Sequence, residues 1–213
     1  MERRPLKTRG RPGAHALASE LARRGIGPNH VSLAGIGFAI VAAAGLVALP
    51  HAGAPAQALL LLVAAAAIQL RLLCNLLDGL IAVENGLKTP TGELYNDVPD
   101  RFADVVIIAA AGYALAWHWG VALGWAAAAA ALLTAYVRVL GGALGTPQHF
   151  LGPMAKPHRM AVLTAACLLS LVEVAASDYR GRILTAALVV ILVGSLATFA
   201  RRLQLIAVEL NAR

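Results

Sequence analysis

Residues 56–84 read AQALLLLVAAAAIQLRLLCNLLDGLIAVE, an apolar run that turns polar toward its C-terminal end. A helix needs about 20 apolar residues to cross a bilayer, and this run is long enough. Its polar end contains Arg71, Asn75, Asp78 and Glu84. An ionisable side chain inside a span costs about 2.5–3.5 kcal/mol on insertion scales, so each one requires a reason. The run therefore predicts a membrane-spanning helix with a polar site at one end.

Five further apolar runs lie along the chain. They cover residues 30–49, 93–116, 121–143, 158–177 and 183–208. Proline and glycine interrupt the chain between several of these runs, as expected where helices break. Within lipid, helices satisfy the backbone hydrogen bonds of such segments internally. We expect an all-α integral membrane protein with six transmembrane helices, which form one domain over residues 28–213.

The composition supports this class of protein. The chain of 213 residues is 59% hydrophobic and only 14% charged, and its mean hydropathy is +0.71. A soluble domain is closer to half apolar and a quarter charged, so the excess apolar surface requires lipid. The net charge of +7 would suggest nucleic acid in a soluble protein. Cys74 and Cys167 both fall inside apolar runs, which argues against a disulfide framework or a cysteine metal cluster.

A basic segment, residues 1–27, precedes the first apolar run. Seven of the 18 Lys and Arg residues lie in its first 24 positions, which favours contact with anionic headgroups. Within it, AHALASELARR places Ala14, Leu17 and Leu21 on one helical face and predicts a short interfacial amphipathic helix. A disordered basic tail is the alternative. The segment is too long, and precedes too many spans, for a cleaved signal peptide.

Loop charges predict the orientation of the spans. Lysine or arginine occurs at both ends of the chain and in two loops on the same side, 85–92 and 144–157. Two loops of the opposite side carry none, 50–55 and 117–120. The third loop on that opposite side, 178–182, carries Arg180 and Arg182 and is an exception to this charge pattern. The positive-inside rule then predicts a multi-pass protein of a bacterial inner membrane, with both termini and the polar site facing the cytoplasm.

The polar residues of the second and third runs share helical faces. Asn75 and Asp78 are three residues apart, and Asn96, Asp100 and Asp104 follow one another in steps of four. The loop between the two runs is short, so we expect antiparallel neighbours whose polar faces meet at one membrane surface. Carboxylate and amide oxygens suit a hard divalent cation such as Mg²⁺, held together with substrate phosphates.

Ion pairs inside the protein are the alternative explanation for these side chains. Arg71 in the second run and Arg101 in the third could neutralise the carboxylates without any metal ion. The number of acidic and amide groups on the two facing helices favours an ion site.

These residues resemble the signature of the CDP-alcohol phosphatidyltransferase family. In words, that signature is Asp-x-x-Asp-Gly-x-x-Ala-Arg, a spacer of eight or nine residues, then Gly-x-x-x-Asp-x-x-x-Asp. The corresponding positions here are Asn75, Asp78, Gly79, Ala82, Val83, Gly92, Asn96 and Asp100. The resemblance extends to the opening of the first span, Pro28-Asn29-His-Val-Ser32, and to the six-span layout. It therefore covers nearly the whole chain.

Three positions depart from the family pattern. Asn75 and Asn96 replace the first and third aspartates, and Val83 replaces the arginine. We expect a divergent bacterial branch of the family that carries both asparagines. The resemblance implies that the first three signature positions hold divalent ions and that Asp100 is the general base for the acceptor hydroxyl.

The asparagines affect the expected metal centre, because a neutral oxygen leaves more of the ion's charge to be balanced by diphosphate. The resemblance implies one or two Mg²⁺ or Mn²⁺ ions. The expected ligands are Asp78, Asn75, Asn96 and Asp100, with Asp97 or Glu84 as a compensating group.

The activity that the resemblance implies is phospholipid synthesis at the membrane. A phosphatidyl group would pass from CDP-diacylglycerol to an alcohol acceptor with release of CMP, in an enzyme that is a homodimer. Such a transfer needs positioning and charge neutralisation more than covalent chemistry. Two alternatives are a CDP-amino-alcohol phosphotransferase acting on a lipid acceptor and a non-catalytic homologue that binds lipid or nucleotide. A transporter is disfavoured, because the polar groups lie at one membrane face and not near the midplane.

Further candidate residues would contact the substrates. Those assigned to the nucleotide and diphosphate are Asn29, Ser32, Gly79, Ala82 and Gly92. Asn29 is equally well explained as the N-cap of the first span. A basic cluster is assigned to an acidic acceptor, often a phosphate in relatives, and comprises Arg138, Lys156, His158 and Arg159. Snorkelling of these basic side chains to lipid headgroups is the alternative.

Overall fold

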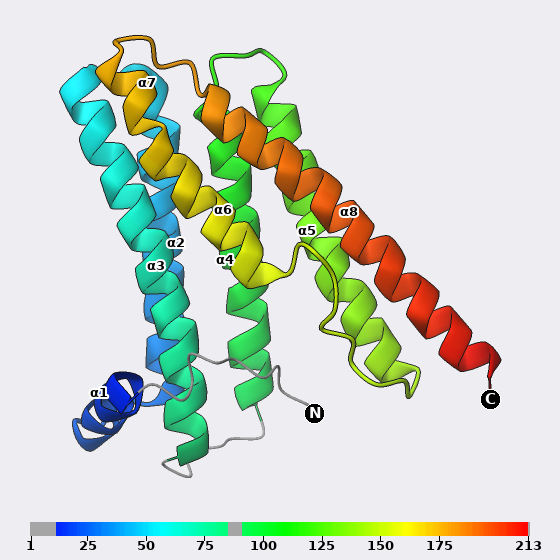
Figure 1. Cartoon of the computed structure of the whole chain (residues 1–213). Coiled ribbons are helices and arrows are strands. Elements are labelled where there is room, and N and C mark those ends of the chain that lie inside the picture. Colours follow the sequence, from blue (N-terminus) through cyan, green and yellow to red (C-terminus); the bar gives the residue numbers. More distant parts are fainter. Residues whose placement is uncertain (1–11, 85–90, 213) are drawn as a thin grey trace.

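The computed structural model describes residues 12–84 and 91–212, apart from the side chains of Glu84, Glu93, Tyr95 and Asn96. This part of the chain is helical and contains no strand, so the predicted all-α class is confirmed. The helices are α1 (Pro12–Arg23), α2 (Pro28–Ala48), α3 (Ala54–Glu84), α4 (Gly92–Tyr113), α5 (Gly120–Ala143), α6 (Lys156–Leu169), α7 (Leu171–Ala175) and α8 (Arg182–Asn211), with a 3-10 turn at Leu49–His51. The long helices run lengthwise in a bundle, and α1 lies across its lower end (Figure 1).

Five helical segments of the described residues are long and apolar enough to cross a membrane. They are Pro28–His51, Ala54–Val83, Gly120–Ala143, Lys156–Ala175 and Arg182–Asn211. The chain is therefore a multi-pass membrane protein. The predicted third span, α4, has 22 residues, but Asp97, Asp100, Arg101 and Asp104 make it too polar to qualify by composition alone.

Small side chains allow the helices to approach closely, while large apolar ones point outward. A Cβ atom on Gly112 of α4 would lie 2.6 Å from the carbonyl oxygen of Gly120, and one on Gly124 of α5 would lie 2.8 Å from that of Ala109. Small residues at helix contacts are typical of membrane bundles. Exposed large apolar side chains occur on the outer surfaces, among them Leu59, Val172, Val193 and Val208. Such surfaces suit lipid rather than water.

The position of α2 differs from the expected arrangement. The sequence predicted direct contact between α3 and α4, but these two helices meet only over a short stretch, and α2 packs against both. Small residues make α2 narrow at this contact. A Cβ atom on Gly35 would lie 3.4 Å from the Cβ of Cys74 on α3. The polar site therefore has walls from three helices rather than two.

The helix α1 coincides with the helix predicted within residues 14–24. It packs against α3, where Ala18 is fully buried and where Ala14 and Leu21 join the same apolar cluster. Leu17, predicted on the same face, is 41% exposed instead. The predicted basic segment 1–27 is described only from residue 12 onward.

Two arginines and one aspartate lie together at the end of the bundle opposite α1. The helix α1, the start of α2 and the end of α8 lie at one end (Figure 1). At the other end, Asp178 accepts hydrogen bonds from Arg180 Nε and Arg182 Nη2, both at 2.9 Å. These bonds lower the pKa of Asp178 from its usual value. The two arginines that break the positive-inside pattern are thus paired with a carboxylate.

Candidate active site

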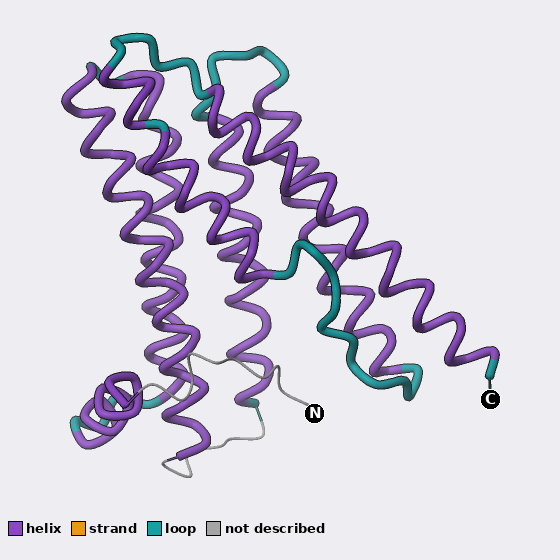
Figure 2. The backbone as a smooth tube through the Cα atoms, viewed as in Figure 1, coloured by secondary structure: helices purple, strands orange, loops and turns teal. Residues whose placement is uncertain are grey.

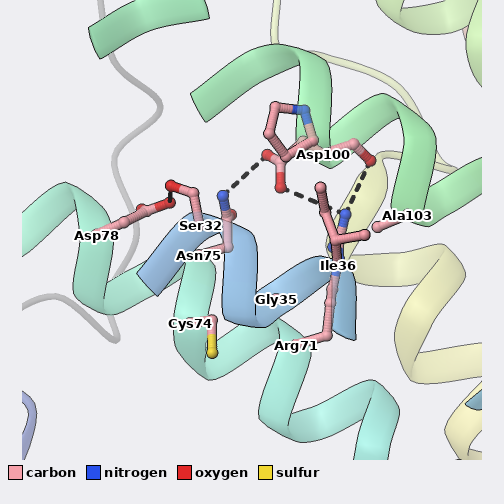
Figure 3. A pocket seen from close by; sticks show the side chains of 10 residues that line it. Ser32, Gly35, Ile36, Arg71, Cys74, Asn75, Asp78, Asp100 and Ala103 are labelled. Carbon is pink, nitrogen blue, oxygen red and sulfur yellow. Dashed lines mark hydrogen bonds and ion pairs between the residues drawn. The ribbon is translucent and has the colours of Figure 1, made fainter. Parts of the chain in front are cut away.

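A polar pocket lies between α2, α3 and α4, toward the end of the bundle that carries α1 (Figure 3). Its position follows from three helices whose polar residues all lie within a few turns of that end. The lining residues are Ser32, Gly35, Ile36, Arg71, Cys74, Asn75, Asp78, Pro99, Asp100 and Ala103. The structure therefore brings together Ser32, three of the signature residues and Arg71. Cys74, Gly35 and Ile36 also line the pocket and had no polar pattern that would have identified them.

Asp78 offers an oxygen atom that the described residues leave without a partner. The residue is 4% exposed. Ser32 Oγ donates a hydrogen bond of 2.6 Å to Asp78 Oδ2, whereas Oδ1 is buried with no hydrogen-bond partner. Buried polar atoms are normally paired, so a carboxylate oxygen with no partner in the protein is able to accept a bond from a ligand. Asp78 is thus arranged to bind a cation or a donor group.

The side chains of Asp100, Asn75 and Lys156 all contact one another. Lys156 forms an ion pair with Asp100 Oδ2 and donates a hydrogen bond of 2.8 Å to Asn75 Oδ1. Asn75 Nδ2 in turn donates a bond of 2.9 Å to Asp100 Oδ2. Lys156 reaches these residues because the segment after α5 runs back from the lower end to the middle of the bundle, where α6 begins (Figure 2).

The helix α8 holds this returning segment in place. The N–H of Met154 donates a hydrogen bond of 3.0 Å to Thr198 Oγ1, and Arg202 Nε donates one of 2.9 Å to the carbonyl of Leu151. Gly152 has φ of +132°, and a Cβ atom there would lie 2.3 Å from Thr198 Cγ2. Sequence reasoning missed Thr198 and Arg202. The two polar residues lie four positions apart in an apolar run, which places them on one helical face, and this pattern could have identified them.

Asp104 forms ion pairs with two buried guanidinium groups. It is 3% exposed and accepts hydrogen bonds from Arg71 Nη2 at 2.8 Å and Arg159 Nη2 at 3.0 Å. Arg71 also donates to the backbone carbonyl of Asp100 at 2.9 Å and lies 3.3 Å from its Oδ1. The alternative of a structural ion pair therefore holds for Asp104.

Arg159 lies inside the protein, with 1% of its surface exposed. Besides Asp104, it donates hydrogen bonds to the carbonyl of Met154 at 2.8 Å and to Thr134 Oγ1 at 3.2 Å. This burial argues against the expected contact of Arg159 with an acceptor. His158 next to it is exposed, with Nδ1 2.9 Å from the carbonyl oxygen of Pro153.

Asp97 belongs to a separate group of contacts outside the lining of the pocket. It accepts hydrogen bonds from Arg101 Nη2 at 2.9 Å and Arg138 Nη2 at 3.2 Å. Arg138 also donates to Gln148 Oε1 at 2.7 Å and lies 5.2 Å from the centre of the Phe150 ring. Both arginines contact the same oxygen, Oδ1, and the compensating role of Asp97 as a metal ligand stays a prediction.

Apart from Ser32, the expected nucleotide contacts do not line the pocket; Asn29, Gly79, Ala82 and Gly92 lie near the ends of α2, α3 and α4. The helix α2 begins at Pro28 after Gly27 as N-cap, so the alternative role of Asn29 as the N-cap is wrong. Ala82 is part-buried near the end of α3, and Gly92 begins α4. The expected ligand atoms of Asn96 and Glu84 lie outside the described residues.

Comparisons with known proteins identify the fold. No protein-family model matches the chain, and no curated protein matches it in sequence. The structure of phosphatidylinositol phosphate synthase (PgsA1) from Mycobacterium tuberculosis with CDP-DAG bound matches with a TM-score of 0.71 at 20% identity, over 91% of this chain and 92% of that one.

Two further structures of the same synthase also match. The complex with manganese and citrate gives a TM-score of 0.71 at 20% identity, over 91% of this chain and 88% of that one. The apo form gives a TM-score of 0.67 at 21% identity, over 89% of this chain and 93% of that one. The chain has the fold of this synthase. Because the synthase is a CDP-alcohol phosphatidyltransferase, the fold that the signature implied is confirmed.

The described side chains alone form no cluster of metal ligands. No group of three or more His, Cys, Asp or Glu residues among them could hold a metal ion. The orphaned oxygen of Asp78 offers one ligand position. Asp100 Oδ2, by contrast, is already taken by Lys156 and Asn75. Of the two signature carboxylates that line the pocket, Asp78 therefore has the oxygen more accessible to an ion, and the expected number of one or two ions stays a prediction.

Proposed function

We propose that this protein transfers a phosphatidyl group from CDP-diacylglycerol to an alcohol acceptor and releases CMP. The supporting observation is that Asp78 and Asp100, from the two halves of the signature, line one pocket, with a buried oxygen of Asp78 left open. The shared fold adds weight, because the synthase with that fold has been solved with CDP-DAG bound.

In the proposed reaction, the acceptor hydroxyl attacks the phosphorus of the lipid phosphate. A new P–O bond forms, the bond from that phosphorus to the bridging oxygen breaks, and CMP leaves with the electron pair. Asp100 accepts the hydroxyl proton as general base. We assign this role to Oδ1, because its contact with Arg71 is long at 3.3 Å, while Oδ2 is bonded to Asn75 and Lys156.

A Mg²⁺ or Mn²⁺ ion bound to Asp78, with Asn96 as a further ligand, would supply Lewis-acid stabilisation of charge on the diphosphate. Ser32 orients Asp78 for this purpose through its hydrogen bond. The proposed contacts of the nucleotide and diphosphate remain Asn29, Ser32, Gly79, Ala82 and Gly92. Arg138 and His158 are the proposed acceptor contacts of the basic cluster, because His158 is exposed and Arg138 is only partly buried.

We propose that α4 is the sixth span and that α1 lies in the membrane interface. Partners inside the protein support the first point, since Asp104 pairs with Arg71 and Arg159 rather than facing lipid. The position of α1 across the end of the bundle supports the second (Figure 1). The proposed setting is a bacterial inner membrane, with both termini and the pocket on the cytoplasmic side, and the proposed assembly is a homodimer.

The test is a transfer assay with the purified full chain in detergent. Labelled CDP-diacylglycerol and Mg²⁺ or Mn²⁺ would be offered with a panel of polyols, sugar phosphates and amino alcohols, and products would be identified by lipid mass together with CMP release. We expect one acceptor class to give product and Asp78→Asn to abolish it. Binding of CDP-diacylglycerol without CMP release for any acceptor would instead favour the non-catalytic homologue.

A further inference from the structure

The ammonium group of Lys156 lies between the first and last positions of the signature. It is paired with Asp100 Oδ2 and hydrogen-bonded at 2.8 Å to Asn75 Oδ1. These oxygens come from two different helices, α4 and α3. Oxygens that converge from two helices on one point are the arrangement expected around a bound cation. Here a cation of the chain itself occupies that point.

The charges of the site agree with this arrangement. Asn75 is neutral where the family pattern has an aspartate, so Asp100 is the only carboxylate among the three residues in contact. Two cations of the chain contact this carboxylate, Lys156 at Oδ2 and Arg71 at 3.3 Å from Oδ1. A divalent ion at the same point would need more negative ligands and would repel the ammonium group at short range.

Contacts of neighbouring residues fix the start of α6, which carries Lys156. Arg159, one turn further along α6, is held by Asp104 and by the carbonyl of Met154. Met154 is in turn bonded to Thr198 of α8. The side chain of Lys156 is only 14% exposed. A preorganised charge of this kind needs no reorganisation when an anionic ligand arrives.

We infer that Lys156 replaces the second divalent ion of this centre. The ammonium group supplies a fixed positive charge to the diphosphate, and the chain binds a single divalent ion, at Asp78. The inference rests on the proposed function, because it concerns the ion and the diphosphate of that same site. It also accounts for Asn75, since an aspartate there would be required only to hold a second ion.

Counting bound Mn²⁺ tests this inference without relying on activity. The purified full chain would be titrated with Mn²⁺ alone, and bound ions would be counted by calorimetry and by the loss of the free-ion EPR signal. We expect about one ion in the wild-type chain and in Asn75→Asp, and about two in Asn75→Asp combined with Lys156→Met, because the double variant offers two carboxylates in place of the ammonium contact. Lys156→Met alone should gain a second, weaker ion.

The matched control is Arg180→Gln, which removes an exposed basic residue at the far end of the bundle and should leave the count unchanged. Size-exclusion profiles would identify variants that do not fold, and the wild-type count alone tests the inference in that case. Two ions in the wild-type chain, or one ion in both Lys156 variants, would overturn it. Absence of any bound Mn²⁺ would overturn it together with the proposed ion, while CMP release from the same preparations tests the transferase proposal separately.

Discussion

The hydroxyl of Ser32 on α2 donates a hydrogen bond of 2.6 Å to Asp78 on α3. This bond joins the opening of the first span to the signature helix and occupies one carboxylate oxygen. The other oxygen of Asp78 remains buried without a partner among the described residues (Figure 3). Ser32 thereby determines which oxygen of Asp78 is available to an ion, and this makes α2 part of the site.

Ser32→Ala should weaken both the site and the fold. Loss of the donor leaves a second buried oxygen of Asp78 unpaired, which costs roughly 1–3 kcal/mol. We expect a lower melting temperature in detergent and a weaker Mn²⁺ affinity, measured by thermal unfolding and calorimetry. Ser32→Thr keeps the hydroxyl and should restore most of both. An alanine variant with unchanged melting and Mn²⁺ affinity would show that the hydrogen bond is not needed.

Asp100→Asn should abolish most of the catalysis. The amide cannot accept the acceptor proton, and removal of a general base lowers rates by roughly 10²–10⁴-fold. The measurement is CMP release at saturating CDP-diacylglycerol, with thermal unfolding to verify the fold. Asp178→Asn is the matched control, because Asp178 lies in an exposed loop at the far end of the bundle and pairs with Arg180 and Arg182. Equal losses in the two variants would remove the case for Asp100 as the base.

Asp104→Asn should mainly destabilise the protein. The substitution keeps the shape of the side chain but removes the carboxylate partner of Arg159 and leaves Arg71, among the described residues, with only its longer, 3.3 Å contact to the carboxylate of Asp100. Removing one partner of a buried ion pair costs roughly 3–5 kcal/mol, so the melting temperature in detergent should fall clearly. Asp178→Asn, on the exposed outer loop, should change it little. If the two variants have the same melting temperature, the buried network does not stabilise the bundle.

Gly124→Ala should disturb the contact between α4 and α5. The new Cβ atom would lie 2.8 Å from the backbone carbonyl of Ala109, and the backbone must move to relieve this contact. Overpacking of this kind costs about 1–3 kcal/mol, measurable as a lower melting temperature. Gly37→Ala on α2 is the control, since nothing lies within 4 Å of its added methyl group. Stability equal to that of the control would mean that the two helices have room to separate.

The sequence was informative about residues close to each other along the chain. Helix spacing placed Asn75 and Asp78 on one face, and the structure has both lining the pocket with Asp100. The same reasoning failed for Asn29, because it identified a capping residue type but not the residue at which α2 begins. It also overestimated the contact between α3 and α4, since a short loop limits the distance between two helices without excluding a third helix from their interface.

Apolar runs and the signature spacing determined, without any structure, that the chain is helical, that it crosses a membrane several times and that acidic residues gather at one end. These properties depend on hydropathy and helical period, which are local. Only the tertiary structure decided that Lys156 reaches Asp100, that Arg159 is buried against Asp104 and that α2 forms a wall of the pocket. The physical reason is that these contacts join segments far apart in the chain, and they depend on how closely the small residues of α2 let it pack and on how α8 holds the segment before α6.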